Sequence, residues 1–551
     1  MFRQTVLSSA MALAALGLVA CGSGGDDNPP PSNATVQVGD TIALTASGRL
    51  ISFNRAAPGT QVGSVAITGL AASETLVGID VRPADGKLYG LGSAGNAYTV
   101  EPSTGVATLK VALKALAGDD NPYTFLTGAN FAVDFNPVAD RLRVISNTGQ
   151  NLRINVDTGD VTTDGVIISG SSSITAAAYT NSFAGASTTQ LFDLDVTAGR
   201  LQLQDPPNDG VLTGAVTLGV VADAANGFDV DARSNTGYAV LNVGGETALY
   251  TINLAATANA ATRVGVIAGG EAIRGLALAA TAAPTAIALT SSNQLVAFDP
   301  KLPNALTATT AINGLGAGEQ MLGIDFRPRD GMLYGLASGG RLYTINPSTG
   351  AATLRATLAA DPADITAPFA GLTGSVTSVD FNPAADRLRV ISSDGQNLRI
   401  VVETATVNGV TVTAGQTTTD GTINRASGAA SVSASAYTNS FAGTLSTVLF
   451  NLEQATDQLT RQDPPNNGTL SDIGPLGVNI TGIAGFDIGG GANGLTLAAL
   501  RTGTTGPFSL HTVSLTTGAA TLYRNTSGNA GLSLIGGATG PANLVDLAIR
   551  F

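Results

Sequence analysis

The sequence predicts an all-β fold of the β-propeller kind, built as two tandem rings of about five four-stranded blades each. The first observation is a long repeat, in which Val133–Ile154 returns as Val379–Ile400 with only three differences in 22 positions. The second is a short repeat, because Val133–Gly159, moved back by 54 residues, lies without a gap on Ile79–Gly105. The third is that short β-type runs between turn signals fill the chain, and no segment keeps the 3.6-residue apolar period of a helix.

One unit, Val77–Val111, shows how a blade is expected to form. It reads as four strands, VGIDV, KLYGL, AYTVE and VATLKV, separated by the turns RPADG, GSAGN and PSTG. Pro83 supplies a fixed φ in the first turn, and Gly86 and Gly105 permit the tight reversals. Four antiparallel strands in roughly 50 residues is the size of one propeller blade.

Each copy of the long repeat contains four such units and one partial unit. In the first copy the partial unit is Thr41–Ile67, and Ile273–Leu278 could provide its missing innermost strand. In the second copy the partial unit is Thr285–Ile312, and Leu544–Phe551 is the possible closing strand. Closing a ring with a strand from the far end of the copy removes exposed sheet edges.

The units divide the chain into two expected propeller-like domains, residues 36–280 and 281–551. Each copy carries all the parts that a ring needs, which favours two separate rings. One continuous ring of about ten blades is the alternative, because Ile273–Leu278 runs almost directly into Thr285.

The first 35 residues predict export and lipid anchoring. Residues 1–21 have a short basic start, an apolar run too short for an ordinary membrane span, and the sequence LVACG at 18–22. Small residues before a cysteine resemble the bacterial lipobox, so Cys21 is the expected lipidated first residue of the mature protein. Gly22 in the next position resembles the Gram-negative pattern for sorting to the outer membrane. Residues 22–35 form a polar tether, expected to be disordered.

Composition excludes several classes of function. The net charge is −13 and only 12% of the residues are charged, which does not suit nucleic acid, since phosphate binding needs clustered Lys and Arg. One cysteine excludes internal disulfides and cysteine-based zinc sites. The one histidine, His511, aligns with Tyr250 of the first copy and is therefore expected to be a strand position. With no GxSxG elbow and no P-loop, we predict no catalytic residue, no metal and no cofactor.

An aspartate recurs on the first strand of several units. Recurrence in blade after blade favours an architectural role, in which each carboxylate accepts hydrogen bonds from backbone N–H groups in its own blade turn. The alternative is a ring of acidic groups around the central channel that could hold a cation. The recurring residues are Asp80, Asp134, Asp229, Asp325, Asp380 and Asp487.

The richest polar set lies in the unit that follows Val77–Val111, and it recurs in the second copy. Positions that are Lys, Tyr, Asn, Ala and Thr in the preceding blade are here arginines and carboxamides. Guanidinium groups are costly to bury without partners. We expect either a network between blades, with Asp134 and Asp140 as partners, or an anion or polar-ligand site that the next unit would help to line. The candidate ligand-binding residues are Asn136, Arg141, Arg143, Gln150, Asn151, Arg153, Tyr179, Asn181, Asn382, Arg387, Arg389, Gln396, Asn397, Arg399, Tyr437 and Asn439.

Several strings in these units also carry a family resemblance. GID-RP-DG-LYGL, VDFNP-ADRLRV-S--GQNLRI, AYTNSFAG at 178–185 and 436–443, and QDPPN-G at 204–210 and 462–468 resemble the bacterial "domain of unknown function 4394" family. The resemblance covers nearly all of residues 36–551 as two copies. It implies an exported β-rich domain, often found in lipoproteins, and it implies no established activity or catalytic residue.

Three classes of function remain open from the sequence. A non-enzymatic binding or scaffolding module of the cell envelope fits the tether and the duplication. Its partner would be an unknown envelope protein, a polysaccharide or a small molecule, and its only membrane contact would be the lipid. A propeller-type hydrolase or lactonase would need converging carboxylates or a metal. A purely structural envelope protein would need neither.

The predicted anchor can be tested by one substitution. Cys21→Ser removes the thiol that would carry the lipid, so the protein is expected to move from the membrane fraction to the soluble fraction of the envelope. Cell fractionation followed by immunoblotting measures this. A Ser variant that fractionates like the wild type would show that the anchor prediction is wrong.

Overall fold

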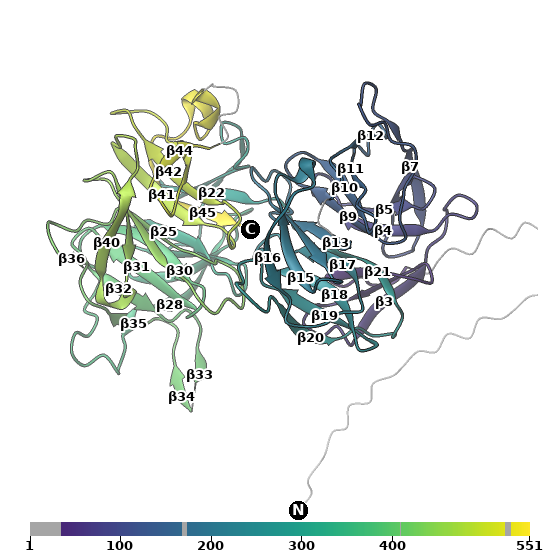
Figure 1. The fold of residues 1–551 in the computed structure, drawn as a ribbon. Coiled ribbons are helices and arrows are strands. Elements are labelled where there is room, and N and C mark those ends of the chain that lie inside the picture. Colours follow the sequence, from purple (N-terminus) through teal and green to yellow (C-terminus); the bar gives the residue numbers. More distant parts are fainter. Residues whose placement is uncertain (1–34, 168–172, 408, 524–529) are drawn as a thin grey trace, which may run out of the picture.

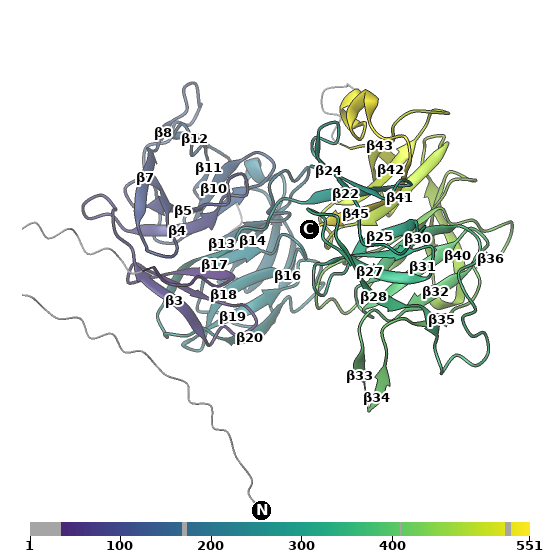
Figure 2. The ribbon, with the colours of Figure 1, turned by 180° about the vertical axis from the view of Figure 1, so that it is seen from behind.

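The computed structural model describes residues 35–167, 173–407, 409–523 and 530–551 of the chain (Figures 1 and 2). These residues form ten sheets of four or five strands and one two-stranded hairpin. The described part contains no α-helix, only four 3-10 turns, and it offers no helical segment with the length and hydropathy of a membrane span. Residues 1–34, with Cys21 and nearly all of the expected tether, lie outside the described residues.

Ring one consists of five blades, each named after its innermost strand. The blades run from the inside outward as β4 (Leu76–Val81), β5 (Leu88–Gly92), β6 (Asn96–Val100), β7 (Ala107–Ala112); β9 (Phe131–Asn136), β10 (Arg141–Ser146), β11 (Asn151–Ile154), β12 (Asp160–Thr163), β8 (Lys114–Ala115); β13 (Ile174–Tyr179), β14 (Leu191–Asp195), β15 (Arg200–Gln204), β16 (Leu212–Thr217); β17 (Ala224–Val230), β18 (Gly237–Val243), β19 (Glu246–Ile252), β20 (Ala261–Val266); and β21 (Ile273–Leu278), β1 (Thr41–Thr45), β2 (Arg49–Phe53), β3 (Gln61–Ala66).

Ring two repeats this order. Its blades are β25 (Met321–Phe326), β26 (Leu333–Ala337), β27 (Arg341–Ile345), β28 (Ala352–Thr357); β30 (Val376–Asn382), β31 (Arg387–Ser392), β32 (Asn397–Ile400), β35 (Gln416–Thr419), β29 (Ala359–Ala360); β37 (Ala434–Tyr437), β38 (Leu449–Glu453), β39 (Gln458–Gln462), β40 (Thr469–Pro475), β36 (Asn424–Arg425); β41 (Gly482–Ile488), β42 (Thr496–Arg501), β43 (Ser509–Val513), β44 (Ala520–Leu522); and β45 (Leu544–Arg550), β22 (Thr285–Thr290), β23 (Gln294–Phe298), β24 (Leu306–Ala311). The 3-10 turns are η1 (Pro207–Asp209), η2 (Pro465–Asn467), η3 (Ala530–Ser533) and η4 (Gly537–Thr539).

Each ring is completed by a strand from the far end of its own copy. In ring one β21 pairs with β1, with Leu278 opposite Thr41, and the innermost strands contact one another in the cyclic order β4, β9, β13, β17, β21. In ring two β45 pairs with β22, and the cyclic order is β25, β30, β37, β41, β45. The expected two rings of five blades are therefore confirmed, and the continuous ring of about ten blades does not form.

The innermost strands approach so closely that some positions accept only glycine. Gly227 on β17 has φ +149°, and a Cβ atom there would lie 2.5 Å from the backbone nitrogen of Leu276. Gly485 occupies the same place in ring two, with φ +155° and the nitrogen of Leu547 at 2.3 Å. A side chain at either position would push two innermost strands apart.

The hydrophobic core is divided among the interfaces between neighbouring blades. Tyr89 of the β4 blade packs on Phe135 of the β9 blade, with ring centroids 5.2 Å apart in an edge-to-face arrangement. Ring two repeats the contact between Tyr334 and Phe381 at 5.3 Å. Because the alternate face of each blade carries apolar residues as well, strands such as β4 are buried on both sides.

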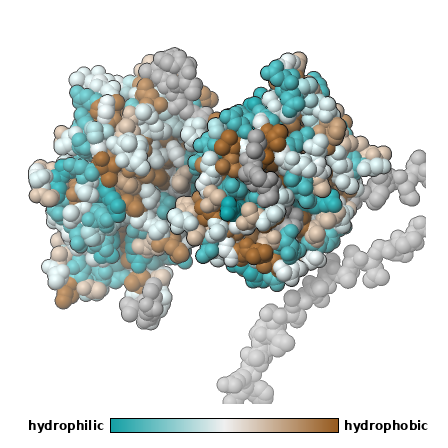
Figure 3. All heavy atoms as spheres, in the orientation of Figure 1, coloured by the Kyte–Doolittle hydropathy of each residue, from teal (hydrophilic) through white to brown (hydrophobic). Residues whose placement is uncertain are grey.

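The two rings lie side by side and touch near the C-terminus (Figures 1 and 2). Phe183, Ala186 and Ala232 of ring one form one apolar cluster with Leu495 of ring two, and Phe551 packs against it. Ring two also carries an extra hairpin, β33 (Ala405–Val407) with β34 (Val410–Val412), which projects from its edge (Figure 1). On the face seen in Figure 3, hydrophilic and hydrophobic residues are interspersed.

Candidate functional site

The recurring aspartates join the innermost strands of neighbouring blades. Asp80 accepts a hydrogen bond from the backbone N–H of Val81 at one oxygen and from that of Phe135, in the next blade, at the other, both at 2.7 Å. Asp134 accepts from the N–H of Tyr179 at 2.9 Å. The expected acceptor role is thus present, but its main partner is the next blade rather than the turn of the same blade. The equivalent bonds run from Leu278 to Asp229, Phe381 to Asp325, Tyr437 to Asp380 and Ile549 to Asp487.

These carboxylates converge at the centre of each ring. Asp80, Asp134 and Asp229 each place an oxygen within 4.8 Å of the others, and Asp325, Asp380 and Asp487 do the same in ring two. Burial, the largest cause, raises the pKa of Asp80 and Asp134 well above the usual range, with a further contribution from the neighbouring carboxylates. Burial likewise raises the pKa of Asp229 to about 7 and that of Asp487 to about 6.

The aspartates at the ring centre could hold a small cation, and the adjacent spaces described in ring one are too small for an organic substrate. The space above Asp229, which Asp231 and Ser182 also line, has a volume of about 20 Å³. A second space deeper in the channel, beside Gly78 and Phe228, has a volume of about 10 Å³. The carboxylates therefore converge, as a propeller hydrolase would require, but at a place that substrate cannot enter.

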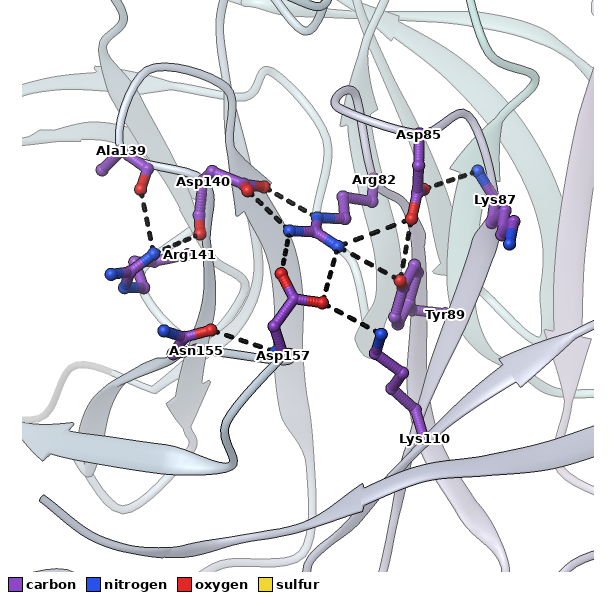
Figure 4. Close-up of polar contacts among 10 residues, drawn as sticks. All are labelled: Arg82, Asp85, Lys87, Tyr89, Lys110, Ala139, Asp140, Arg141, Asn155 and Asp157. Carbon is purple, nitrogen blue, oxygen red and sulfur yellow. Dashed lines mark hydrogen bonds and ion pairs between the residues drawn. The ribbon is translucent and has the colours of Figure 1, made fainter.

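An arginine that the sequence analysis did not single out clamps the β4 blade to the β9 blade (Figure 4). Arg82 follows β4 and is almost fully buried, and its guanidinium lies 2.6 Å from Asp140 and 2.7 Å from Asp157. Lys110 contacts Asp157 at 2.9 Å, and the two cations lower the pKa of Asp157 to about 2. Asp140 was expected in a network between blades, and the partner of its carboxylate is Arg82 of the preceding blade rather than Arg141, Arg143 or Arg153. Ring two repeats the clamp with Arg327, Asp386 and Glu403.

Arg143 is the centre of a second buried network, between the β9 and β13 blades. Only 2% of its surface is exposed. It donates to the Tyr179 hydroxyl at 3.1 Å, to Asn151 Oδ1 at 2.8 Å, to Asp164 at 2.6 Å and to Asn208 Oδ1 at 2.8 Å. All of its nitrogens are therefore occupied by protein groups. In ring two Arg389 repeats each bond, with partners Tyr437, Asn397, Asp420 and Asn466.

Most of the other candidate ligand-binding residues form hydrogen bonds with the backbone of nearby turns and loops. Asn136 accepts from the N–H groups of Val138 and Ala139, and Arg141 donates to backbone carbonyls of its own turn. Gln150 bonds to the backbone of residues 125 and 127, and Arg153 pairs with Asp164 at 2.7 Å while one-third exposed. The copy-two residues Asn382, Arg387, Gln396 and Arg399 make the corresponding contacts. This geometry favours the network interpretation over a ligand site at the arginines.

A cleft of about 530 Å³ lies between the β13 and β17 blades and reaches the second ring. Of the predicted candidates only Asn181 lines it. Asn181 and Asn235 bond to each other, and Asn235 Nδ2 also donates to the carbonyl of Ala492, in ring two, at 2.8 Å. The lining contains Thr, Ser, Asn, Gln, Ala, Ile, Leu and Phe side chains and no ionisable group. It comes from residues 180–181, 188–190, 192, 234–236, 251–255 and 492.

A comparison of the sequence with known protein families finds the same two copies as the long repeat. The domain of unknown function DUF4394 matches residues 49–277 and again residues 294–535. The chain belongs to this family. No curated protein matches the chain.

Two solved structures are distantly similar to this pair of DUF4394 domains. The Dos1 propeller is 12% identical with a TM-score of 0.23, over 65% of this chain and 90% of that one. A crystallised protein from Lactobacillus plantarum is 13% identical with a TM-score of 0.25, over 66% of this chain and 96% of that one. The propeller architecture of the DUF4394 domains rests on their strand order and pairing.

The two DUF4394 copies differ at one buried position that the sequence analysis missed. Asp193 on β14 is fully buried, and neither of its oxygens has a hydrogen-bond partner among the described residues. Its counterpart, Asn451, donates through Nδ2 to Gln462 Oε1 at 3.5 Å. In ring one the matching acceptor, Gln204 Oε1, is buried without a partner in the described part of the chain. A protonated Asp193 would supply the missing donor, and burial raises its pKa well above the usual range.

The first prediction from these contacts compares Arg143→Ala with Arg141→Ala. Losing Arg143 leaves Asp164 buried beside one remaining cation, which should cost about 3–5 kcal/mol of unfolding free energy. Losing Arg141 removes only bonds to exposed turn carbonyls and should cost about 0.5 kcal/mol or less. Urea denaturation followed by circular dichroism measures both, and Arg389→Ala serves as the repeat in ring two. Equal small losses at Arg143 and Arg141 would contradict the buried network.

The second prediction concerns pH. Because the folded pKa of Asp193 is raised, its contribution to stability is complete below the unfolded value near 3.9 and is lost as pH rises through the folded value. Asp193→Asn should therefore stabilise the protein at pH 7–8, by about 1.4 kcal/mol per unit of raised pKa, with the gain vanishing towards pH 4. Asn451→Asp should show the opposite effect. Denaturation at several pH values measures both effects. A stability difference between variant and wild type that does not change with pH would refute the hydrogen bond from protonated Asp193 to Gln204.

Proposed function

We propose that the protein is an exported, lipid-anchored component of the cell envelope that acts as a non-enzymatic binding module. The observation that carries this proposal is the cleft between the β13 and β17 blades, which is large enough for a ligand and has no ionisable side chain in its lining. Acid–base catalysis needs a group that exchanges protons, and a serine or threonine nucleophile needs an adjacent base. A cleft of hydroxyl, carboxamide and apolar groups can bind a ligand but cannot provide this chemistry.

The hydrolase alternative is weakened by where the acidic groups lie. The converging aspartates are at the ring centres, where the adjacent spaces in ring one are about 10–20 Å³. The guanidinium groups of Arg82 and Arg143 are bonded to carboxylates and carboxamides of the protein, so they do not offer a vacant site for an anion. A purely structural protein would account for these networks, but it would not need the cleft.

The start of the sequence supports the proposed location. The lipobox-like LVACG would give a lipid at Cys21, and the polar residues 22–35 would hold the two rings away from the membrane surface. Gly22 supports sorting to the outer membrane of a Gram-negative bacterium. In this position the cleft would be presented to an envelope protein, a polysaccharide or a small molecule.

A cleft-filling substitution tests the binding role. Ala255 is exposed at the cleft, so Ala255→Trp should obstruct it without disturbing the core. With residues 1–21 removed, the wild-type chain is expected to bind isolated envelope material in a sedimentation assay, and Ala255→Trp to bind at least tenfold more weakly.

The matched control is Thr516→Trp, the exposed counterpart in ring two, which should bind like the wild type. Both variants should keep the wild-type melting temperature, because the added ring lies at the surface. Unchanged binding by Ala255→Trp would show that the cleft is not the binding site.

A further inference from the structure

We propose that the ligand of the cleft is a neutral saccharide chain, bound as one molecule per protein between ring one and a loop of ring two. This inference rests on the proposed binding function and adds the chemical class and the stoichiometry. Four features of the cleft support it: its hydrogen-bonding groups, its apolar wall, its lack of charge and its asymmetry between the two copies.

Polar groups in the cleft remain available to a ligand. Among the described residues, the carboxamide of Gln190, the hydroxyl of Thr236 and Nδ2 of Asn253 have no hydrogen-bond partner in the protein, whereas the other polar groups of these residues do. A carboxamide and a hydroxyl each offer both a donor and an acceptor. A sugar hydroxyl does the same, so such a lining suits a polyhydroxylated ligand.

The cleft also has an apolar wall, and its charge is zero. Phe192 and Leu254 are half-buried, so part of each side chain faces the open space and can cover the C–H face of a sugar ring. With no Lys, Arg, Asp, Glu or His in the lining, an anionic or cationic chain would lose hydration without gaining an ion pair. A neutral ligand avoids this cost.

A peptide is less well suited than a saccharide. Extended peptides usually bind by adding a strand to a free sheet edge. Here the two strands at the wall are already paired on both sides, β14 with β13 and β15, and β19 with β18 and β20. The rest of the lining consists of turns and loop residues, whose hydrogen bonds fix the loops themselves.

Hydrogen bonds between the two rings hold one wall of the cleft in place before a ligand binds. The N–H of Gly491 in ring two donates to the carbonyl of Arg233 at 2.5 Å, next to the bond from Asn235 to Ala492. A Cβ atom on Gly491 would lie 2.7 Å from the carbonyl oxygen of Ser234, so only glycine allows this approach. The loop of ring two is therefore held as one wall of the cleft, which reduces the ordering that binding would require.

The second ring does not repeat these binding groups. Gln190 is replaced by Val448, Thr236 by Gly494 and Ser234 by Ala492. The loop of ring two that carries Ala492 and Gly494 is the one that docks against ring one. Duplication has thus produced one composite cleft rather than two equal sites, which is why we expect a single ligand per chain.

Isothermal titration calorimetry of the chain lacking residues 1–21 tests the inference. The neutral probes are maltohexaose, cellohexaose and fully N-acetylated chitohexaose, compared with anionic hexagalacturonate and a Gly/Ser hexapeptide with blocked termini. At least one neutral oligosaccharide should bind at one per chain. Its affinity should change by less than about twofold between about 0.05 M and 0.5 M salt, because no ion pair is formed.

Variants assign the binding to the cleft. Gln190→Val combined with Thr236→Gly, which installs the residues of ring two, should weaken the neutral oligosaccharide by about tenfold or more. Val448→Gln, at the matched position of ring two, should leave the affinity unchanged. Thermal denaturation of the double variant should coincide with the wild type, since Gln190 is exposed and Thr236 is partly exposed. Val448 is partly buried against the core of ring two, so a single cooperative melting transition should show that Val448→Gln is folded before its affinity is compared.

Other outcomes overturn the inference. Preference for hexagalacturonate or the peptide, binding of two molecules per chain, or full affinity in the Gln190/Thr236 double variant would each contradict it. If no neutral oligosaccharide binds while envelope binding still depends on Ala255, the saccharide inference fails and the binding function stands. If envelope binding does not depend on Ala255, the proposed function itself fails.

Discussion

The hydrogen bond from an aspartate carboxylate to the backbone N–H of the next innermost strand is the interaction on which each ring depends. Asp80, Asp134 and Asp229 carry these bonds in ring one, and they are buried, so no water can take the place of the N–H groups. Meeting at the ring centre, the carboxylates repel one another, and their pKa values rise as burial also disfavours charge. The ring centre is therefore a structural feature, in which buried neighbouring carboxylates join the blades.

Buried arginines also join neighbouring blades, at positions farther from the centre of the ring. Arg82 joins the β4 blade to the β9 blade through Asp140 and Asp157, and Arg143 joins the β9 blade to the β13 blade through Tyr179 and Asn208. Each guanidinium is fully provided with acceptors, which is the condition for burying such a charge. The most strongly repeated motif of the chain is therefore devoted to joining blades, and its regularity reflects packing rather than ligand chemistry.

The cleft is found where the two copies have diverged. The loop that follows β41 in ring two carries three consecutive glycines at 489–491, and its backbone lies against residues 233–235 of ring one. In ring one the equivalent loop keeps Asn235, which braces Asn181 and lines the cleft. In the proposed binding module, docking and ligand binding would be divided between these two equivalent loops.

The sequence by itself determined the β-propeller class, the five units per copy, and the closing strands Ile273–Leu278 and Leu544–Phe551, because turn residues and strand periodicity are local signals that repeat. It also identified the polar set around Arg143, with its partners Asn151 and Tyr179, but it overlooked Arg82, Asp164 and Asp193. Only the tertiary structure decided these, because the hydrogen bonds within and between blades join residues 21 to 75 positions apart and depend on which way each strand faces. The cleft could not be predicted from the sequence either, since its lining joins residues of two neighbouring blades of ring one with Ala492 of ring two.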